Sequence, residues 1–215
     1  MMSNKIKIDI VSDVVCPWCI IGYKNLQAAI EELGIEDKVD LQWQPFELNP
    51  NMPAEGQDLG EHVAEKYGSS VTESEQARIN IRERGAQVGF TFNFYGGMKI
   101  VNTRDAHILL EYAHQFGKQT EFKLRLFSAT FTDRKDVSDR DVLLKEIELL
   151  GLNVEQAVLR LQDVEYKNAV IDQETYWQNL GISAVPAVVF NRKSAVSGAQ
   201  SIETYKEVLT ELLAA

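Results

Sequence analysis

Strand-like patterns are concentrated near the two ends of this 215-residue chain. Apolar and polar residues alternate over residues 6–10 and again over residues 39–45, and a helical pattern separates the two runs. Near the other end, residues 185–190 and 194–196 have the composition of a β-hairpin, which a last helix follows. Almost all of residues 58–181 is helical in pattern. Because neither end supplies enough strands for a separate sheet, the sequence predicts one sheet built from both ends, with a helical insertion between its halves.

The predicted fold class is therefore α/β, with a sheet-containing unit interrupted by helices. We expect residues 1–50 and 182–215 to form that unit and residues 51–181 to form the insertion, whose last helix could belong to either. The composition is that of an ordinary globular protein, with 45% apolar and 25% charged residues. The length is ample for burying a hydrophobic core.

Short local patterns predict where several elements begin and end. Gly34 is a suitable C-cap for the first helix, and Ser201 a suitable N-cap for the last. The aromatic, glycine-ended segment from Phe90 to Gly97 is expected to be a loop. The predicted helix starts inside the insertion are the pairs Thr72 and Glu75, Ser138 and Asp141, and Asn153 and Gln156.

The net charge is negative, because 22 Lys and Arg stand against 32 Asp and Glu, which gives −10. This balance argues against a nucleic-acid partner and against docking on anionic membranes. No stretch approaches the roughly 18 consecutive apolar residues of a membrane span. Lys7 and Asp9 interrupt the apolar residues at the N-terminus, so we expect no secretory signal and a cytoplasmic location.

The motif that carries chemistry is Cys16-Pro17-Trp18-Cys19, placed where a strand becomes a helix. Unpaired backbone N–H groups and the helix dipole stabilise a thiolate at such a position. Cys16 precedes the helix and faces these donors, while Cys19 lies one turn further on, close enough to form a disulfide with it. We expect Cys16 to be exposed and nucleophilic and Cys19 to be shielded, as thiol–disulfide exchange requires.

Two less reactive interpretations of the cysteines remain open at this point. A structural zinc site needs about four ligands. The chain has two Cys and three His, without the spacing of a zinc site, and we therefore expect no metal. Two unreactive core cysteines are the other alternative, since free Cys is commonly buried.

Three segments, residues 12–19, 181–190 and 196–200, resemble the thioredoxin superfamily, and within it the DsbA-like proteins of the FrnE group. The resemblance implies a thioredoxin fold interrupted by a helical domain. It also implies a cis Val185-Pro186 peptide beside Cys16, with the Val185 backbone pairing with a substrate chain. Cys16 and Cys19 would be catalytic. The motif and substrate-binding residues would be Pro17, Trp18, Val185 and Pro186.

The chain departs from the superfamily pattern in two respects. The buried acid that many thioredoxin-like proteins carry six residues before the first cysteine is replaced by Ile10. Strand alternation directs Asp9 away from the face of Ile10, so water is expected to carry the proton of Cys19. The dipeptide between the cysteines also lacks the His of strongly oxidising DsbA proteins, which predicts a less oxidising couple.

Other residues leave alternatives open. The aromatic residues of the 90–97 segment could line a substrate cleft or pack the insertion onto the sheet unit. Asn102 and Thr103 are expected first to cap a helix, with a place in the cleft as a second interpretation. His107 and His114 lie seven residues apart, so solvent or packing is expected for them rather than metal.

The predicted function is a thiol–disulfide oxidoreductase or isomerase acting on protein or small disulfides. The first alternative is a glutathione-dependent isomerase or transferase, similar to 2-hydroxychromene-2-carboxylate isomerases and kappa-class glutathione transferases, which typically use Ser in place of the first Cys. A non-enzymatic chaperone or interaction module is the second. No tightly bound cofactor is expected, and glutathione is a candidate redox partner. The sequence leaves open whether the protein is a monomer or a dimer.

Overall fold

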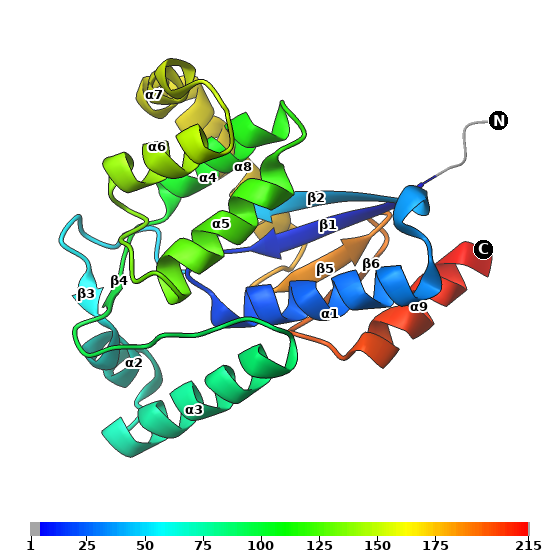
Figure 1. Cartoon of the computed structure of the whole chain (residues 1–215), viewed down its shortest axis with the longest axis horizontal. Helices are drawn as coiled ribbons and strands as arrows, with labels where there is room; N and C mark the ends of the chain where they lie inside the picture. The colour runs from blue at the N-terminus through cyan, green and yellow to red at the C-terminus, as the bar shows by residue number, and fades with distance from the viewer. Residues whose placement is uncertain (1–4, 215) are drawn as a thin grey trace.

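A four-stranded sheet joins the two ends of the chain in the computed structural model, which describes residues 5–214 (Figure 1). Its strands are β1 (Ile6–Ser12), β2 (Val39–Pro45), β5 (Ala187–Phe190) and β6 (Ser194–Ser197), in the order β2-β1-β5-β6. β1 and β2 are parallel, whereas β5 is antiparallel to both of its neighbours. The predicted single sheet from both ends is confirmed.

Helices cover both faces of this sheet. α1 (Pro17–Leu33) and α9 (Ile202–Ala214) pack together on one face, toward which Ile8 and Ile10 contribute to a shared apolar core (Figure 1). α8 (Val164–Asn179) covers the other face, where its Trp177 packs against Val11 of β1. This split follows from strand alternation, which sends successive side chains of β1 to opposite faces.

The rest of the helical part forms a second core beside the sheet. Apolar side chains of α4, α5, α6 and α7, with one turn of α8, pack against one another there. A short two-stranded sheet, β3 (Gln57–Asp58) with β4 (Lys99–Ile100), was not expected from the sequence. The remaining elements are η1 (Glu36–Lys38), α2 (Leu59–Tyr67), α3 (Val71–Gln87), α4 (Arg104–His114), α5 (Gln119–Phe131), α6 (Arg140–Leu149) and α7 (Val154–Gln162).

The predicted start of α3 is wrong by two residues. The capping box is formed by Ser70 and Glu73, because Ser70 Oγ accepts a hydrogen bond from Glu73 N at 3.3 Å and Glu73 Oε2 accepts one from Ser70 N at 2.8 Å. Thr72 and Glu75 have the same spacing but already lie inside the helix. Two overlapping patterns of one kind cannot be separated by spacing alone.

The predicted start of α6 is also wrong, by one residue. Asp139 Oδ1 caps the helix by accepting a hydrogen bond from Asp141 N at 2.9 Å. The Ser138 hydroxyl instead donates to Asp136 Oδ1 at 2.6 Å in the preceding turn. The predicted cap of α7 is confirmed, since Asn153 Oδ1 accepts from the N–H of Gln156.

The ends of α1 and α9 confirm the sequence predictions. α1 ends at Gly34, which has a positive φ of 62°. Ser201 Oγ accepts a hydrogen bond from Thr204 N at the start of α9. The division into residues 1–50 plus 182–215 and residues 51–181 stays a prediction. No helix within residues 5–214 is long and apolar enough to cross a bilayer.

Candidate active site

The two cysteines lie at the start of α1, which a short loop joins to β1. Cys16 is the N-cap residue, Pro17 is the first helical residue, and Cys19 N donates a hydrogen bond to Cys16 O at 3.1 Å. Both cysteines are free thiols. Cys19 is fully buried, as expected, but Cys16 is only 4% exposed, and the expectation of an exposed Cys16 is wrong. The reason is that Cys16 belongs to the apolar core around α1 and meets the Val185–Pro186 segment.

The Val185–Pro186 segment lies against the start of α1. Its peptide bond is cis, as the resemblance implied, and Cys16 Sγ donates to Val185 O at 3.7 Å. α1 comes very close to it, because a Cβ added to Gly22 would lie 3.4 Å from the Pro186 ring. The structure thus brings Cys16, Cys19, Val185 and Pro186 together. Their roles in catalysis and substrate binding stay predictions.

The environment of Cys19 keeps its thiol protonated. Burial raises the pKa of Cys19 well above its usual value, and its hydrogen bond with the Cys16 sulfur raises it further. The positive charge of Lys123 acts in the opposite direction. A thiol in this state attacks only after losing its proton. The site therefore needs a group that takes this proton.

Lys123 of α5 is the charged neighbour that the sequence did not reveal. Its side chain is fully buried, its Nζ donates to Ser12 O at 3.4 Å, and the Nζ lies 5.3 Å from the ring centres of Trp43 and Phe127. Burial lowers the pKa of Lys123 to about 8, although the nearby Cys19 and Asp13 partly oppose this shift. No sequence signal separates this lysine from the solvent-exposed basic residues of the same region.

Asp13 holds the loop that leads from β1 into Cys16. It is fully buried, with Oδ1 accepting from Val14 N at 2.7 Å and Oδ2 accepting from Leu48 N at 2.8 Å. Its third partner is His107 Nε2 of α4, at 3.3 Å from Oδ1. Burial would raise the pKa of Asp13, but these hydrogen bonds and the His107 charge outweigh it and hold the pKa below the usual value.

The histidine and Asp9 expectations agree with these contacts. His107 is buried, with its Nε2 next to Asp13, and His114 is exposed. Asp9 faces away from the cysteines, and its Oδ1 accepts from Gln44 Nε2 at 2.7 Å, while Ile10 lies in the core on the cysteine side. Within residues 5–214 no group of three or more His, Cys, Asp and Glu side chains is placed to hold a metal ion.

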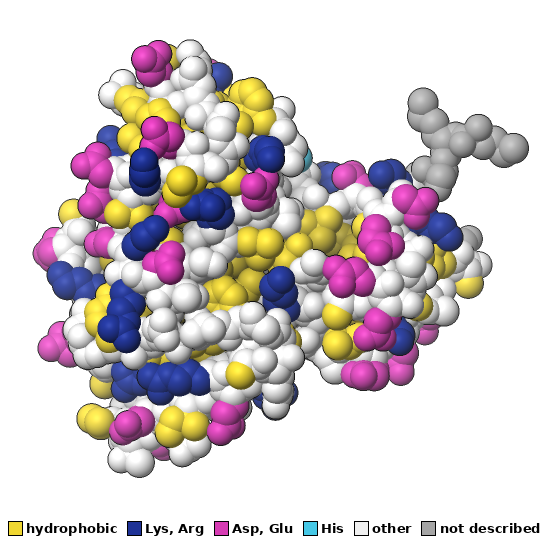
Figure 2. Space-filling view, viewed as in Figure 1, with side chains coloured by type: hydrophobic (Ala, Val, Ile, Leu, Met, Phe, Trp, Pro, Cys, Tyr) yellow, Lys and Arg dark blue, Asp and Glu magenta, His cyan; other side chains and the backbone are white. Residues whose placement is uncertain are grey.

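A groove of about 520 Å³ opens beside Trp18 of the motif. It runs between α1, α3 and the segment before α9, and its lining includes Trp18, Ile21, Lys24, Arg84 and Gln200. The space-filling view shows Lys and Arg side chains gathered over α3 and apolar side chains across the middle of the same face (Figure 2). The lining of the groove therefore mixes apolar side chains, such as Trp18 and Ile21, with the charged side chains of Lys24, Arg84 and Glu203.

The aromatic residues of the 90–97 segment are expected either to line a cleft or to pack the insertion onto the sheet unit, and different residues do each. Phe90 and Phe92 are buried, and the Phe92 ring lies 5.1 Å from that of Phe131 of α5, so this half packs α5 onto the sheet unit. Phe94 is partly exposed, and Tyr95 lines a smaller cavity together with Val15, next to Cys16.

Asn102 and Thr103 act at the start of α4. Asn102 Oδ1 accepts a hydrogen bond from Arg104 N at 3.0 Å, whereas Thr103 makes no side-chain capping bond. The expected capping role is confirmed for Asn102. Neither residue lines the groove beside Trp18.

A family model described as the DSBA-like thioredoxin domain matches residues 7–210. The chain belongs to the DSBA-like thioredoxin domain family. Membership confirms the predicted thioredoxin fold with a helical insertion, and it places this DSBA-like protein among DsbA-like thiol–disulfide oxidoreductases. Its assignment to the FrnE group stays a prediction.

Solved structures agree with the family. A probable DsbA oxidoreductase from Streptomyces coelicolor is 27% identical and has a TM-score of 0.91, over 97% of this chain and 90% of that chain. A 2-hydroxychromene-2-carboxylate isomerase has a TM-score of 0.74 at 12% identity, over 96% of each chain. The cytosolic disulfide reductase DsbM from Pseudomonas aeruginosa, solved with GSH, has a TM-score of 0.67 at 16% identity, over 97% of this chain and 100% of that chain. These last two likenesses show the fold alone.

The geometry gives this DSBA-like protein the parts of a dithiol exchange site. Two thiols lie one helical turn apart, one of them bonded to the Val185 carbonyl and the other held protonated in the core. Such a pair can form an intramolecular disulfide and can return to two thiols.

Proposed function

We propose that this protein is a thiol–disulfide oxidoreductase in which Cys16 attacks a substrate disulfide and Cys19 resolves the mixed disulfide. The observation that carries the proposal is the cysteine pair in the first turn of α1, with Cys16 Sγ 3.7 Å from Val185 O. A lone nucleophile would have no use for a second thiol one turn away. The substrates are proteins or small disulfides.

The proposed reaction moves two electrons. The Cys16 thiolate attacks one sulfur of the substrate disulfide, so that a Cys16–substrate bond forms and the substrate bond breaks with release of one thiolate. Cys19 then loses its proton and attacks Cys16 Sγ, which forms the Cys16–Cys19 disulfide and releases the second substrate thiolate. The substrate is reduced and the protein oxidised. The same steps in reverse oxidise a substrate dithiol.

The neighbouring residues have supporting roles in this proposal. Pro17 starts the helix, because it needs no hydrogen-bond partner for a backbone N–H there. Val185, which precedes β5, presents its backbone to a substrate chain as a short added strand, and Pro186 packs behind it. Trp18 is partly exposed at the groove, and we propose that the groove receives the substrate segment flanking the reacting sulfur.

Glutathione chemistry is the second candidate function. The likeness to a 2-hydroxychromene-2-carboxylate isomerase and to a disulfide reductase solved with GSH favours it. In the leading proposal glutathione is a redox partner of the cysteine pair. In the alternative glutathione is a cosubstrate, and the reaction does not require Cys19. We propose a cytoplasmic location, supported by the cytosolic reductase among the similar structures.

Substitution of the resolving cysteine separates these functions. Cys19→Ala removes a small buried thiol and the resolving step, so the mixed disulfide on Cys16 is expected to accumulate in cells. With protein substrates, non-reducing gels show a ladder of adducts that reductant removes. The matched control is the double variant Cys16→Ser with Cys19→Ala, which is expected to trap nothing.

Other outcomes of this experiment have defined meanings. A single glutathione adduct shows that glutathione is the partner. If Cys19→Ala traps nothing and retains full activity on a small substrate, the dithiol mechanism is wrong and the glutathione-dependent alternative is favoured.

A further inference from the structure

The core beneath the cysteines holds a lysine with an unusual set of neighbours. Within residues 5–214, the carbonyl oxygen of Ser12 is the only hydrogen-bond acceptor of Lys123 Nζ, at the long distance of 3.4 Å. A buried ammonium normally has several strong acceptors. Here the faces of Trp43 and Phe127 supply much of the remaining stabilisation, each ring centre lying 5.3 Å away. Lys123 is thus held in place with donor capacity to spare.

The charged and titratable groups around Lys123 come from three elements. Cys19 belongs to α1, Cys16 is the N-cap residue of that helix, and Asp13 belongs to the loop before it. His107 and Glu111 of α4 lie across a small cavity that Lys123 also lines. Asp13 is already bonded by two backbone N–H groups and by His107, which leaves the two thiols as the neighbours that exchange protons during turnover. Of these two thiols, Cys19 is the one that is fully buried.

We propose that Lys123 Nζ is the proton carrier of Cys19, taking the proton of the thiol when Cys19 attacks and returning it when Cys19 leaves as a thiolate. The proposal rests on the proposed dithiol function. In β1, Ile10 stands where many thioredoxin-like proteins carry the acid that takes this proton, and we assign the same role to Lys123 on a helix of the insertion. From the sequence, water is expected in this role.

The proton balance is simple in both directions. During resolution the neutral amine of Lys123 takes the Cys19 proton, and the Cys19 thiolate forms a bond with Cys16 Sγ as the substrate thiolate leaves. In reverse, a substrate thiolate attacks Cys16 of the disulfide, and Cys19 leaves as a thiolate beside the ammonium, which returns the proton. A pKa of about 8 allows Lys123 to change its charge near neutral pH, as a proton carrier must.

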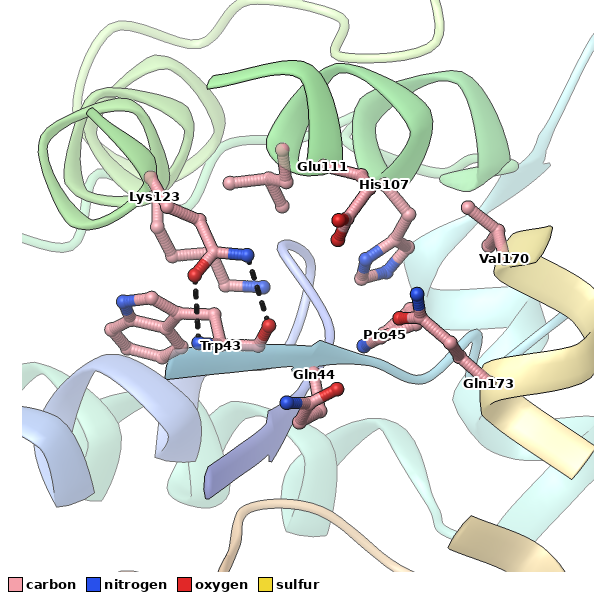
Figure 3. A pocket seen from close by; sticks show the side chains of 10 residues that line it. Trp43, Gln44, Pro45, His107, Glu111, Lys123, Val170 and Gln173 are labelled. Carbon is pink, nitrogen blue, oxygen red and sulfur yellow. Dashed lines mark hydrogen bonds between the residues drawn. The ribbon is translucent and has the colours of Figure 1, made fainter. Parts of the chain in front are cut away.

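A small cavity lies beside this lysine. Its volume is about 10 Å³, close to the roughly 10–15 Å³ that one water molecule needs. Lys123 lines one side of the cavity, and His107, Glu111 and Gln173 line the other (Figure 3). Glu111 is only partly buried, so a proton on Lys123 can reach solvent by way of one water and the Glu111 carboxylate.

The two steps of the reaction can be timed separately with an aromatic disulfide, 5,5′-dithiobis(2-nitrobenzoate), added in one equivalent to the reduced protein. Attack by Cys16 releases the first coloured thiolate, and resolution by Cys19 releases the second. We expect the rate of the second phase to rise with pH around a midpoint near 8, where Lys123 becomes neutral. In Lys123→Met the second phase should slow by about 10- to 100-fold near neutral pH and lose this midpoint, while the first phase is unchanged.

The matched control is Lys118→Met, the same substitution next to the start of α5 at a side chain that pairs with Glu121 on the surface. Both phases should keep wild-type rates and pH profiles in this control. A Lys123→Met protein that resolves at the wild-type rate, or that loses both phases equally, would overturn the proposal.

If Lys123→Met does not fold, the wild-type pH profile decides alone. A second phase that rises only far above pH 8 contradicts a proton carrier with the properties of Lys123. The proposed function fails in a different way, since then even the wild-type protein would release no second thiolate and form no Cys16–Cys19 disulfide.

Discussion

Two opposite charges, those of Asp13 and Lys123, are buried near the cysteine pair, and each is stabilised differently. Asp13 is bonded by Val14 N, Leu48 N and His107, so its carboxylate is fully paired without water. Lys123 relies mainly on two aromatic faces. A buried carboxylate with strong partners keeps its charge, whereas a buried ammonium with weak partners gives up its proton easily. We therefore assign Asp13 to structure and Lys123 to proton transfer.

The structural role of Asp13 predicts a pH-dependent loss of stability. Asp13→Asn replaces one acceptor oxygen by a donor facing an N–H group, which should cost about 1–3 kcal/mol in the free energy of unfolding at neutral pH. Because the pKa of Asp13 is lowered in the folded protein, its stabilisation is complete above its unfolded pKa and disappears as the pH falls through the folded pKa. Urea unfolding of both proteins should show the difference narrowing below about pH 4.

Asp40→Asn is the control for this measurement, because Asp40 is exposed on β2. It should unfold like the wild type across the same pH range. An Asp13→Asn protein as stable as the wild type at neutral pH, or a difference that stays constant in acid, would show that the hydrogen bonds of Asp13 contribute little.

At this scale the sequence identified the residues of the motif and missed those that surround it. Cys16, Cys19 and the cis Val185-Pro186 peptide follow from local patterns and a resemblance, so their positions could be predicted. His107 and Lys123 lie about a hundred residues along the chain from the cysteines, on helices that only the folded core brings there. Burial of a lone lysine on an otherwise mixed helix has no local signature.

At the scale of elements, α3 and the aromatic segment that follows it touch at Gly85. A Cβ added there would overlap the Phe92 ring and lie 2.7 Å from Phe90 O. No rotation of a flexible side chain relieves the second contact, because Phe90 O is a backbone atom. Since Phe92 in turn packs on Phe131 of α5, this contact couples α3 to the helices beside the cysteines.

The close approach at Gly85 predicts that a single methyl group is harmful. Gly85→Ala should lower the free energy of unfolding by about 1–3 kcal/mol, since overpacking outweighs the better helix propensity of Ala. The control is Gly96→Ala in the same segment, where an added Cβ meets nothing within 4 Å. Thermal unfolding of the two variants tests this, and equal stabilities would mean that the segment moves aside freely.

The presence of a helix is easier to predict from the sequence than its first residue, because the first residue depends on a single capping hydrogen bond. The apolar pattern of α1, together with Gly34, predicts the two ends of that helix to within one residue. In α3 the choice between Ser70 and Thr72 depends on which N–H group remains unpaired, and both patterns satisfy the same spacing rule. The two-residue strands β3 and β4 are too short to produce any periodic signal.

At the scale of the whole molecule, three carboxyl and guanidinium side chains join the sheet to the helices. Arg104 of α4 donates to Glu47 Oε1 at 2.7 Å, in the segment after β2. Glu174 of α8 lies close enough to interact electrostatically with both Glu47 and Arg104. Its Oε1 is buried with no hydrogen-bond partner among the described residues. Burial and the Glu47 charge raise the pKa of Glu174 from 4.5 to about 8.

This arrangement predicts that the protein loses stability as the pH rises. The folded protein binds the proton of Glu174 more tightly than the unfolded chain, so its contribution is complete below pH 4.5 and falls as the pH rises to about 8. Glu174→Gln, which is neutral at every pH, should match the wild type near pH 5 and exceed it by about 1–3 kcal/mol near pH 8. Urea unfolding at the two pH values measures the gain.

Asp172→Asn, on the exposed side of the same helix, is the charge-matched control and should show no such gain. A Glu174→Gln protein less stable than the wild type at pH 8 would mean that the carboxylate is ionised and paired there. The sequence predicted the sheet that unites both chain ends, but it gave no sign of this junction, because its members come from three separate segments.

The central claim is that Cys16 and Cys19 form one reversible redox couple. Its most direct measurement is the intact mass of the protein after incubation with glutathione disulfide and alkylation of the remaining thiols. We predict that oxidised protein takes up no alkylating agent, carries no glutathione, and recovers two reactive thiols after dithiothreitol. Two thiols that remain reactive after oxidation, or a stable glutathione adduct on Cys16 beside a free Cys19, would contradict the account.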